Sequence, residues 1–333
     1  MLIPVLLFIV GLACLIKGGD WFVDGAAGIA KRFHMPEILV GATVVSIGTT
    51  LPEVMVSASS AVLGHGEFAY GNAIGSIICN TALIAAITIA VKPSDVERKS
   101  LVVPTFFFFV AAAFYCAVAY TAGFFSRITG ILLLTLFVIY MVTTVRQAIK
   151  SPDRAEAGDA AEGAVPEPAD KEPEKDRPLW LLIVLIIVGA ALIAVGADLL
   201  VDNGTLIAQA LGVPESVIAL TFVALGTSLP ELVTAITSLA KGYGALSLGN
   251  VIGANLFNLV LVCGISCTLS PFAVPVEKQI GGFPASFVID IPLMFLVMAF
   301  VTVPALIRGK LSRIQGIVLL AVYAAFCIFQ FVG

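Results

Sequence analysis

Two acidic residues, Glu53 and Glu231, lie inside long apolar stretches of this 333-residue chain, and each directly follows a proline. An ionised carboxylate in the interior of a membrane costs about 2.5 kcal/mol or more, so it needs a partner. No lysine or arginine within the apolar stretches is placed to pair with both glutamates. Two carboxylates about 5 Å apart repel each other by roughly 3 kcal/mol at an effective dielectric constant near 20. A divalent cation would neutralise such a pair, and protons or several monovalent cations are the alternatives.

Each glutamate ends a motif rich in oxygen ligands, GTTLPE for Glu53 and GTSLPE for Glu231. Because proline has no N–H for the carbonyl four residues earlier, we expect the helix to break around residues 46–51 and at the equivalent residues of the second motif. Carbonyls left bare in a membrane persist only beside a cavity or a bound cation. Cages of about six to eight oxygens suit Ca²⁺, and the lack of thiolate and imidazole argues against zinc or copper. The oxygen ligands expected here are the carbonyls of Ser46–Thr49 and Ala224–Thr227, together with hydroxyls and side-chain amides.

Amide side chains follow each motif on the next apolar stretch. Asn72, Ser76 and Asn80 recur every four residues and therefore share one face of a helix. For Asn72 and its equivalent, cation binding and interhelical hydrogen bonding or capping are equally consistent with the sequence. The equivalent residues of the second half are Asn250, Ala254 and Asn258. Glycine pairs beside them allow close approach of helices: Gly71 with Gly75, and Gly249 with Gly253.

These motifs belong to an internal repeat. Residues 41–80 and 219–258 match at a constant offset of 178, with fifteen of forty positions identical. The same offset pairs Asp20 with Asp198 and Asp24 with Asp202. A shared apolar bias would not align proline, glutamate, asparagine and glycine in register, so the chain contains two copies of one unit.

The elements that position the repeats are membrane spans. Apolar residues make up 59% of the chain and charged residues only 12%, and the mean hydropathy is +1.07, which excludes a water-soluble domain. A net charge of −4 without a basic stripe excludes a nucleic-acid partner. Ten apolar runs are long enough to cross a bilayer: 2–29, 37–63, 67–91, 101–121, 125–147, 179–210, 214–240, 243–269, 284–306 and 311–332. The fold class is therefore an all-α membrane protein.

Five spans form each repeat unit, so the second copy is inverted relative to the first. Inverted repeats are typical of secondary transporters, whose sites lie near the bilayer midplane where interrupted helices meet. The interrupted spans here are the second and the seventh. We expect a first five-helix repeat over 1–148, with its motif at about 41–83, and a second over 179–333, with its motif at about 219–261.

The linker between the repeats, residues 149–178, is rich in acids and prolines and has no aromatic residue, which predicts disorder. Loops after the odd-numbered spans hold 15 of the 18 basic residues. By the positive-inside rule these loops and the linker are cytoplasmic, and both termini lie outside the cell membrane.

The two motifs, GTTLPE…GNAIGSIICN and GTSLPE…GNVIGANLFN, resemble the alpha repeats of the cation/calcium antiporter superfamily, within it the sodium/calcium exchanger branch. The resemblance implies that Glu53 and Glu231 are acidic ligands shared by Ca²⁺ and Na⁺, helped by the carbonyls of Thr49 and Thr227. It also implies a prokaryotic-type member without regulatory domains. Flanking Na⁺ sites would use hydroxyls of Thr50, Ser76 and Ser228 and carbonyls near Ser46 and Ala224, while Asn80 and Asn258 would line the centre.

Two positions refine what the resemblance implies. Ala254 stands where the first repeat has Ser76, so one Na⁺ site lacks a hydroxyl. Exchangers of this family that co-transport potassium have aspartate at the position of Asn258, so the amide indicates potassium independence.

The expected function is therefore secondary antiport of Ca²⁺ against Na⁺ by alternating access, with a net charge moved in each cycle. A Ca²⁺/H⁺ exchanger that protonates the same glutamates is the alternative. A passive channel is disfavoured because a deep two-glutamate cage binds too tightly for fast conduction. An enzyme is not expected, since the sequence shows no nucleophile–base set and no phosphate loop. Spans 1 and 6 are the expected moving pair, and no cofactor or protein partner is predicted beyond Ca²⁺, Na⁺ and the lipid bilayer.

Overall fold

The structure, a computed structural model, describes residues 2–64, 66–93, 96–149, 177–211, 226–276 and 279–332. Nine described helices are long and apolar enough to cross a membrane, and Leu229–Ala240 is a shorter apolar helix. In chain order the spans are α1 (Leu2–Arg32); α2 (Glu37–Val40), η1 (Gly41–Val45) and α3 (Ser46–Val62); α4 (Gly66–Cys79), η2 (Asn80–Ala85) and α5 (Ala86–Val91); α6 (Arg98–Ala122); α7 (Arg127–Ile149); α9 (Leu179–Ala210); α11 (Leu229–Ala240); α12 (Gly244–Phe257), η4 (Asn258–Val262) and α13 (Cys263–Leu269); η5 (Ser286–Asp290) and α14 (Ile291–Arg308); and α15 (Arg313–Val332).

The helical membrane architecture predicted from the sequence is confirmed, and nine of the ten spans end within a few residues of their expected bounds. The first half of the seventh span, 214–225, lies outside the described residues, and α11 is its second half. The linker 149–178 lies outside them as well, except at its ends. Two short antiparallel pairings complete the described elements: β1 (Phe124–Phe125) with β2 (Phe272–Ala273), and β3 (Gln279–Ile280) with β4 (Phe283–Pro284).

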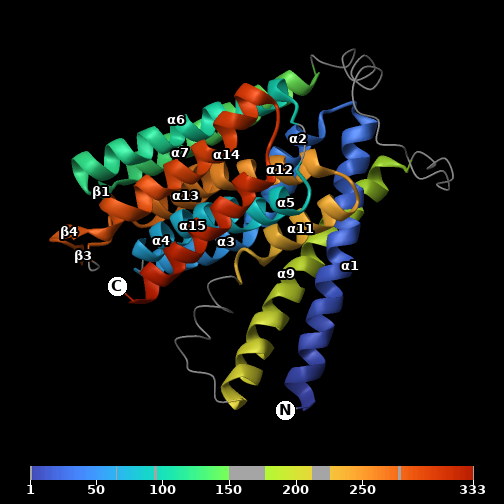
Figure 1. Cartoon of the computed structure of the whole chain (residues 1–333), viewed down its shortest axis with the longest axis horizontal. Helices are drawn as coiled ribbons and strands as arrows, with labels where there is room; N and C mark the ends of the chain where they lie inside the picture. Colours follow the sequence, from blue (N-terminus) through green and yellow to red (C-terminus); the bar gives the residue numbers. More distant parts are fainter. Residues whose placement is uncertain are drawn as a thin grey trace.

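The longest helices, α1 and α9, run side by side and lean away from the rest of the bundle (Figure 1). Glycines allow this contact, because a Cβ on Gly11 would lie 2.9 Å from the Gly196 carbonyl oxygen and one on Gly18 would lie 2.9 Å from that of Gly189. The two expected moving spans therefore form one tightly packed unit.

At the centre of the bundle, α12 packs against the start of the second span. A Cβ on Gly249 would collide with the backbone of Ile38, and one on Gly253 would collide with Ala42, so this glycine pair has the close-packing role expected of it. No described atom lies within 4 Å of a Cβ built on Gly71 or Gly75. The residues that the repeat would place against that pair, 216–224, lie outside the described residues.

The interruption of the second span differs from the prediction. We expected a break around 46–51, but helical backbone continues from Glu37 to Val62, with π-helical geometry at η1 and Pro52 inside α3. Side chains satisfy carbonyls at the irregular segment: the hydroxyl of Ser46 lies 2.8 Å from the Gly41 oxygen, and Tyr140 donates to the Ala42 oxygen at 2.7 Å. A proline inside a helix removes one hydrogen bond and can bend the helix without ending it.

The seventh span is described only from residue 226 onwards, so its expected interruption stays a prediction. Its described part begins with a turn over 226–228, and α11 starts only at Leu229, with Pro230 in the first turn. Proline is tolerated there because the first N–H groups of a helix have no intrahelical acceptor. The two copies of the motif thus adopt different backbones.

Candidate cation site

Glu53 and Glu231 occupy equivalent positions on α3 and α11 and are both fully buried. The two carboxylates are close enough for their charges to interact. Neither oxygen of either side chain has a hydrogen-bond partner among the described residues. Glu231 lies in the first turn of α11, where the positive end of the helix dipole favours a negative charge. Burying two carboxylates without donors is costly unless protons or cations neutralise them.

Two further side chains share this lack of partners. Asn80 and Asn258 are fully buried, and neither the oxygen nor the nitrogen of either amide is hydrogen-bonded in the described part of the chain. Each asparagine begins a π-helical segment, η2 and η4 respectively. Segment η2 packs against α11, which carries Glu231, and η4 packs against α3, which carries Glu53. Leaving a buried polar group unsatisfied costs about 1–3 kcal/mol, so this concentration of them indicates ligand-binding groups.

Thr49 and Ser228 lie close to Glu231. The hydroxyl of Thr49 is next to the Glu231 carboxylate and donates to Asn250 Oδ1 at 3.2 Å. The hydroxyl of Ser228, at the N-terminus of α11, is next to the thiol of Cys79, which also lies near Glu231. Thr50 is fully buried, and its hydroxyl has no hydrogen-bond partner among the described residues.

The two asparagines with alternative interpretations both make interhelical hydrogen bonds. Asn250 lies within hydrogen-bond distance of Ser46, whose hydroxyl is 2.9 Å from the Asn250 main-chain oxygen, and it accepts the bond from Thr49. Asn72 donates to the hydroxyl of Ser57 at 2.8 Å. These bonds join the helices around the site, and ligation by either amide stays a prediction.

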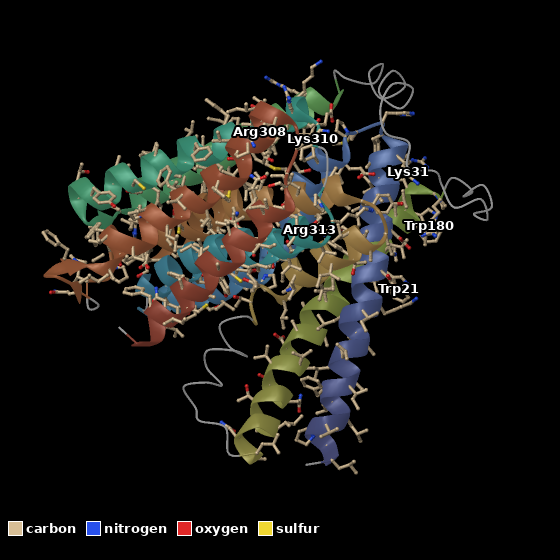
Figure 2. All side chains as sticks on the ribbon, in the orientation of Figure 1. Trp21, Lys31, Trp180, Arg308, Lys310 and Arg313 are labelled. Atoms are coloured by element: carbon tan, nitrogen blue, oxygen red, sulfur yellow. The ribbon has the colours of Figure 1, made fainter. Side chains whose placement is uncertain are left out.

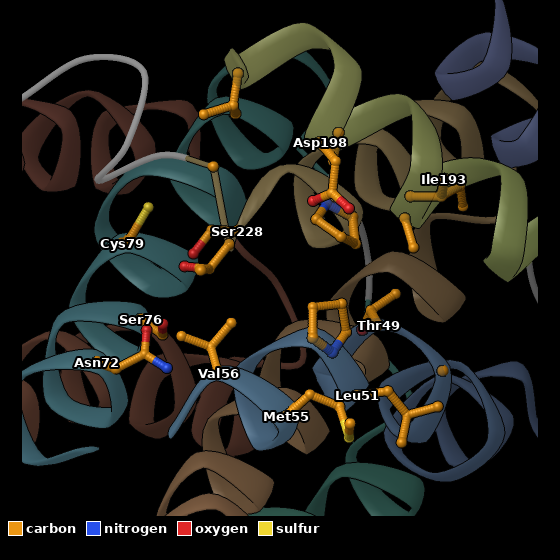
Figure 3. Close-up of a pocket in the computed structure, with 18 of the residues that line it drawn as sticks. Thr49, Leu51, Met55, Val56, Asn72, Ser76, Cys79, Ile193, Asp198 and Ser228 are labelled. Atoms are coloured by element: carbon orange, nitrogen blue, oxygen red, sulfur yellow. The ribbon is translucent and has the colours of Figure 1, made fainter. Parts of the chain in front are cut away.

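A cavity of about 1350 Å³ adjoins this cluster, between α3, α4, α9, α15 and the start of α11. Figure 3 shows Thr49 on α3, Asn72 and Ser76 on α4, and Ser228 at the start of α11 around it. Thr227 lines the same cavity. Ala254 is fully buried, and the expected ligand Ala224 lies outside the described residues.

Asp198, which the repeat pairs with Asp20, also lines the cavity, and Figure 3 shows its carboxyl group from α9. Two features of the site were missed from the sequence. Cys79 lines the cavity beside Ser228, although an apolar neighbourhood suggested only packing. The π-helical segments that begin at Asn80 and Asn258 were not predicted, because the spacing of residues carries no signature of a π helix. The one available signal was that both asparagines occupy equivalent places in the repeat.

Known proteins resemble this chain over most of its length. A family model described as Sodium/calcium exchanger protein matches residues 3–146 and 181–332. An uncharacterized membrane protein of Methanocaldococcus jannaschii is 33% identical over 328 residues, covering 95% of this chain and 94% of that protein. A Methanosarcina acetivorans protein named sodium/calcium exchanger MaX1 is 27% identical over 350 residues, with 98% of each covered. A solved structure of the sodium-calcium exchanger NCX_Mj, soaked with Na⁺ and Sr²⁺, aligns with a TM-score of 0.77 and 31% identity over 97% of both chains.

Proposed function

The chain belongs to the sodium/calcium exchanger family, and from that premise we propose that it exchanges Ca²⁺ for Na⁺ across the cell membrane as a secondary antiporter. The family transports ions and is not a family of enzymes. Only residues 147–180 separate the two matched segments, as expected for a prokaryotic-type member without large regulatory domains. One observation carries the proposal: Glu53 and Glu231, equivalent residues of inverted repeats, are both fully buried, and their carboxylates have no donor among the described residues.

The charge of the site supports this pair of substrates. Two carboxylates carry −2, so one Ca²⁺ gives a neutral site and three Na⁺ give +1. Neither state buries a large net charge, which would be costly at this depth. Both cations therefore compete for the same glutamates, with the carbonyls of Thr49 and Thr227 as further ligands. Exchange of three Na⁺ for one Ca²⁺ moves one net charge per cycle, which makes transport electrogenic.

The remaining ligands follow from the same arrangement. The hydroxyls of Thr50, Ser76 and Ser228 serve Na⁺ at the flanks, and Asn80 and Asn258 line the centre. The unsatisfied amides of both asparagines support this assignment. The amide of Asn258, in place of an acid, makes the exchanger independent of potassium.

Transport proceeds by alternating access, in which the paired helices α1 and α9 move past the bundle that holds the glutamates. The halves 1–148 and 179–333 form the inverted repeats, and the linker 149–178 is cytoplasmic. Figure 2 supports this orientation, because Lys31, Arg308 and Lys310 lie towards the same end of the molecule, where Trp180 also lies at the start of α9. Both termini then face the outside.

A flux assay separates the proposal from the Ca²⁺/H⁺ alternative. Proteoliposomes loaded with Na⁺ are diluted into Na⁺-free buffer, and uptake of ⁴⁵Ca²⁺ is followed with and without a pH gradient. We expect uptake that depends on the outward Na⁺ gradient and responds to membrane potential. Uptake driven only by the pH gradient would favour the proton-coupled alternative, and downhill flux without a counter-ion would indicate a channel.

A further inference from the structure

The lysine that follows α11, Lys241, contacts two acidic residues of helix α1. The ammonium of Lys241 lies 2.7 Å from Asp24 Oδ1 and 3.3 Å from Asp20 Oδ1, and it donates to the main-chain oxygen of Asp20 at 3.0 Å. Asp20 and Asp24 are four residues apart, so they lie on the same face of α1 in successive turns. A single cation therefore holds two turns of the helix. We name Lys241, Asp20 and Asp24 the latch.

The latch joins the two parts of the molecule that exchange must move apart. Lys241 follows α11, the helix that carries Glu231, and precedes α12. Its partners lie on α1, which forms one packed unit with α9. The three side chains are between 26% and 40% exposed, so their charges are partly shielded from water. Sliding of the α1–α9 unit along the bundle separates Lys241 from its partners.

The internal repeat provides a comparison within the same chain. The equivalents of Asp20 and Asp24 are Asp198 and Asp202, but the equivalent of Lys241 is Leu63. Both aspartates line the cavity, and neither has an ion pair with any residue that the structure describes. Leu63 is 75% exposed. The α1–α9 unit thus carries an acidic pair towards each end, and among the described residues a cation of the bundle pairs only with Asp20 and Asp24.

We propose that Lys241 is a positioning residue that biases the exchanger towards the conformation in which α1 is docked on the turn after α11, the side assigned to the cytoplasm. This inference rests on the proposed function, because it assumes that α1 and α9 move during exchange. An interaction present in only one of two conformations shifts their populations by its own free energy. Without the latch, the state open to the cytoplasm gains population, and the apparent affinity for cytoplasmic Ca²⁺ rises relative to that for external Ca²⁺.

Two substitutions, one at each end of the α1–α9 unit, test this bias between the two conformations. Lys241→Met removes the ammonium and keeps most of the apolar stem, and we expect the ratio of external to cytoplasmic half-saturating Ca²⁺ to rise about fivefold, which corresponds to about 1 kcal/mol. Leu63→Lys places a cation opposite Asp198 and Asp202 and should shift the ratio in the same direction, because it favours closure of the other side. Lys241→Arg retains the charge and should restore a near-wild-type ratio. Lys99→Met, which removes an exposed charge from α6, is the control and should leave the ratio unchanged.

The ratio is measured in proteoliposomes of known protein orientation, with Ca²⁺ varied on one side at a time. A ratio in Lys241→Met equal to that of the wild type would overturn the inference, and so would an equal change in Lys99→Met. If the wild type itself shows no Na⁺-dependent Ca²⁺ flux, the proposed function fails instead. The ratio can then be measured with whichever counter-ion drives flux, so the two failures are distinguishable.

A cross-link tests separation of the latch directly. The double variant Asp24→Cys with Lys241→Cys is joined by a short bifunctional thiol reagent that a reductant cleaves, and each single variant with the same reagent is the control. We expect the cross-link to abolish exchange, to leave equilibrium Ca²⁺ binding to the purified protein intact, and to be reversed by the reductant. Exchange at the full rate with the cross-link in place would show that these residues do not part, and would overturn the inference.

Discussion

Replacing Glu231 by glutamine removes one negative charge from the proposed site and keeps the shape of the side chain. Glu231 is fully buried, and no described residue donates a hydrogen bond to its carboxylate. A bound cation would therefore lose one negative charge from its surroundings, and solvent would not replace it. Removing one partner of a buried pair of opposite charges, here the carboxylate beside its bound Ca²⁺, costs about 3–5 kcal/mol. At about 1.4 kcal/mol per tenfold change, we expect Ca²⁺ affinity to fall by roughly two to three and a half orders of magnitude.

The loss of affinity should come with a gain in the stability of the ion-free protein. When both carboxylates are ionised and about 5 Å apart, they repel each other by roughly 3 kcal/mol in the ion-free wild type. Glu231→Gln removes that repulsion, so thermal unfolding of the protein in a Ca²⁺- and Na⁺-free buffer should shift to higher temperature. A variant that binds Ca²⁺ more weakly because it is misfolded would instead unfold at lower temperature. The combination of weaker binding and higher stability is specific to a charged pair.

Equilibrium binding of ⁴⁵Ca²⁺ to purified protein, without Na⁺, measures the first effect. Glu53→Gln should cost a similar amount, because the residue is equivalent in the repeat and equally buried. Glu97→Gln is the matched control: Glu97 is exposed and accepts a hydrogen bond from Ser100 at 2.6 Å, far along the chain from the site motifs. Affinity of Glu231→Gln within about threefold of the wild type would refute the assignment of this carboxylate as a ligand.

Three further substitutions test the packing and the ligand set. Tyr140→Phe leaves the Ala42 carbonyl without its donor and should lower the free energy of unfolding by about 1–3 kcal/mol in a denaturation assay, whereas an unchanged value would contradict the role given to that hydroxyl. Gly249→Ala forces a methyl group into a neighbouring backbone and should cost about 1–3 kcal/mol by the same assay, whereas an unchanged free energy of unfolding would contradict the packing. Ala254→Ser restores the hydroxyl found in the first repeat and should lower the Na⁺ concentration for half-maximal exchange about two- to fivefold, as a gain of about 0.5–1 kcal/mol implies, and no change would argue against a Na⁺ site there.

The spans could be predicted because the bilayer restricts them strongly. A run of apolar residues that is long enough to cross must form a helix, since no other local structure satisfies its backbone in lipid. The glutamates were identified for a related reason, because charge in such a run needs a partner. The repeat then placed the two halves in register, and its equivalents extend to Asn80 and Asn258, which the structure shows to be buried and unsatisfied.

The backbone at the motifs could not be predicted from proline alone. Pro52 and Pro230 occupy the same place in the repeat, yet the first lies within a continuous helix and the second opens one. The first motif follows a π segment in which the Ala42 carbonyl accepts a hydrogen bond from Tyr140, a residue distant in sequence. The contact between Lys241 and α1 is a tertiary contact as well. The repeat could not predict it, because the residue equivalent to Lys241 in the first copy is Leu63.

The central claim is that Glu53 and Glu231 together hold the transported cation. X-ray diffraction from crystals soaked in Sr²⁺, which scatters anomalously, tests it most directly. We predict an anomalous peak between the two carboxylates, at about 2.3–2.6 Å from oxygens of both for a calcium-like ion, that weakens as Na⁺ is added. A peak elsewhere, for example beside Asp198 and Asp202, with none between the two glutamates would contradict the account.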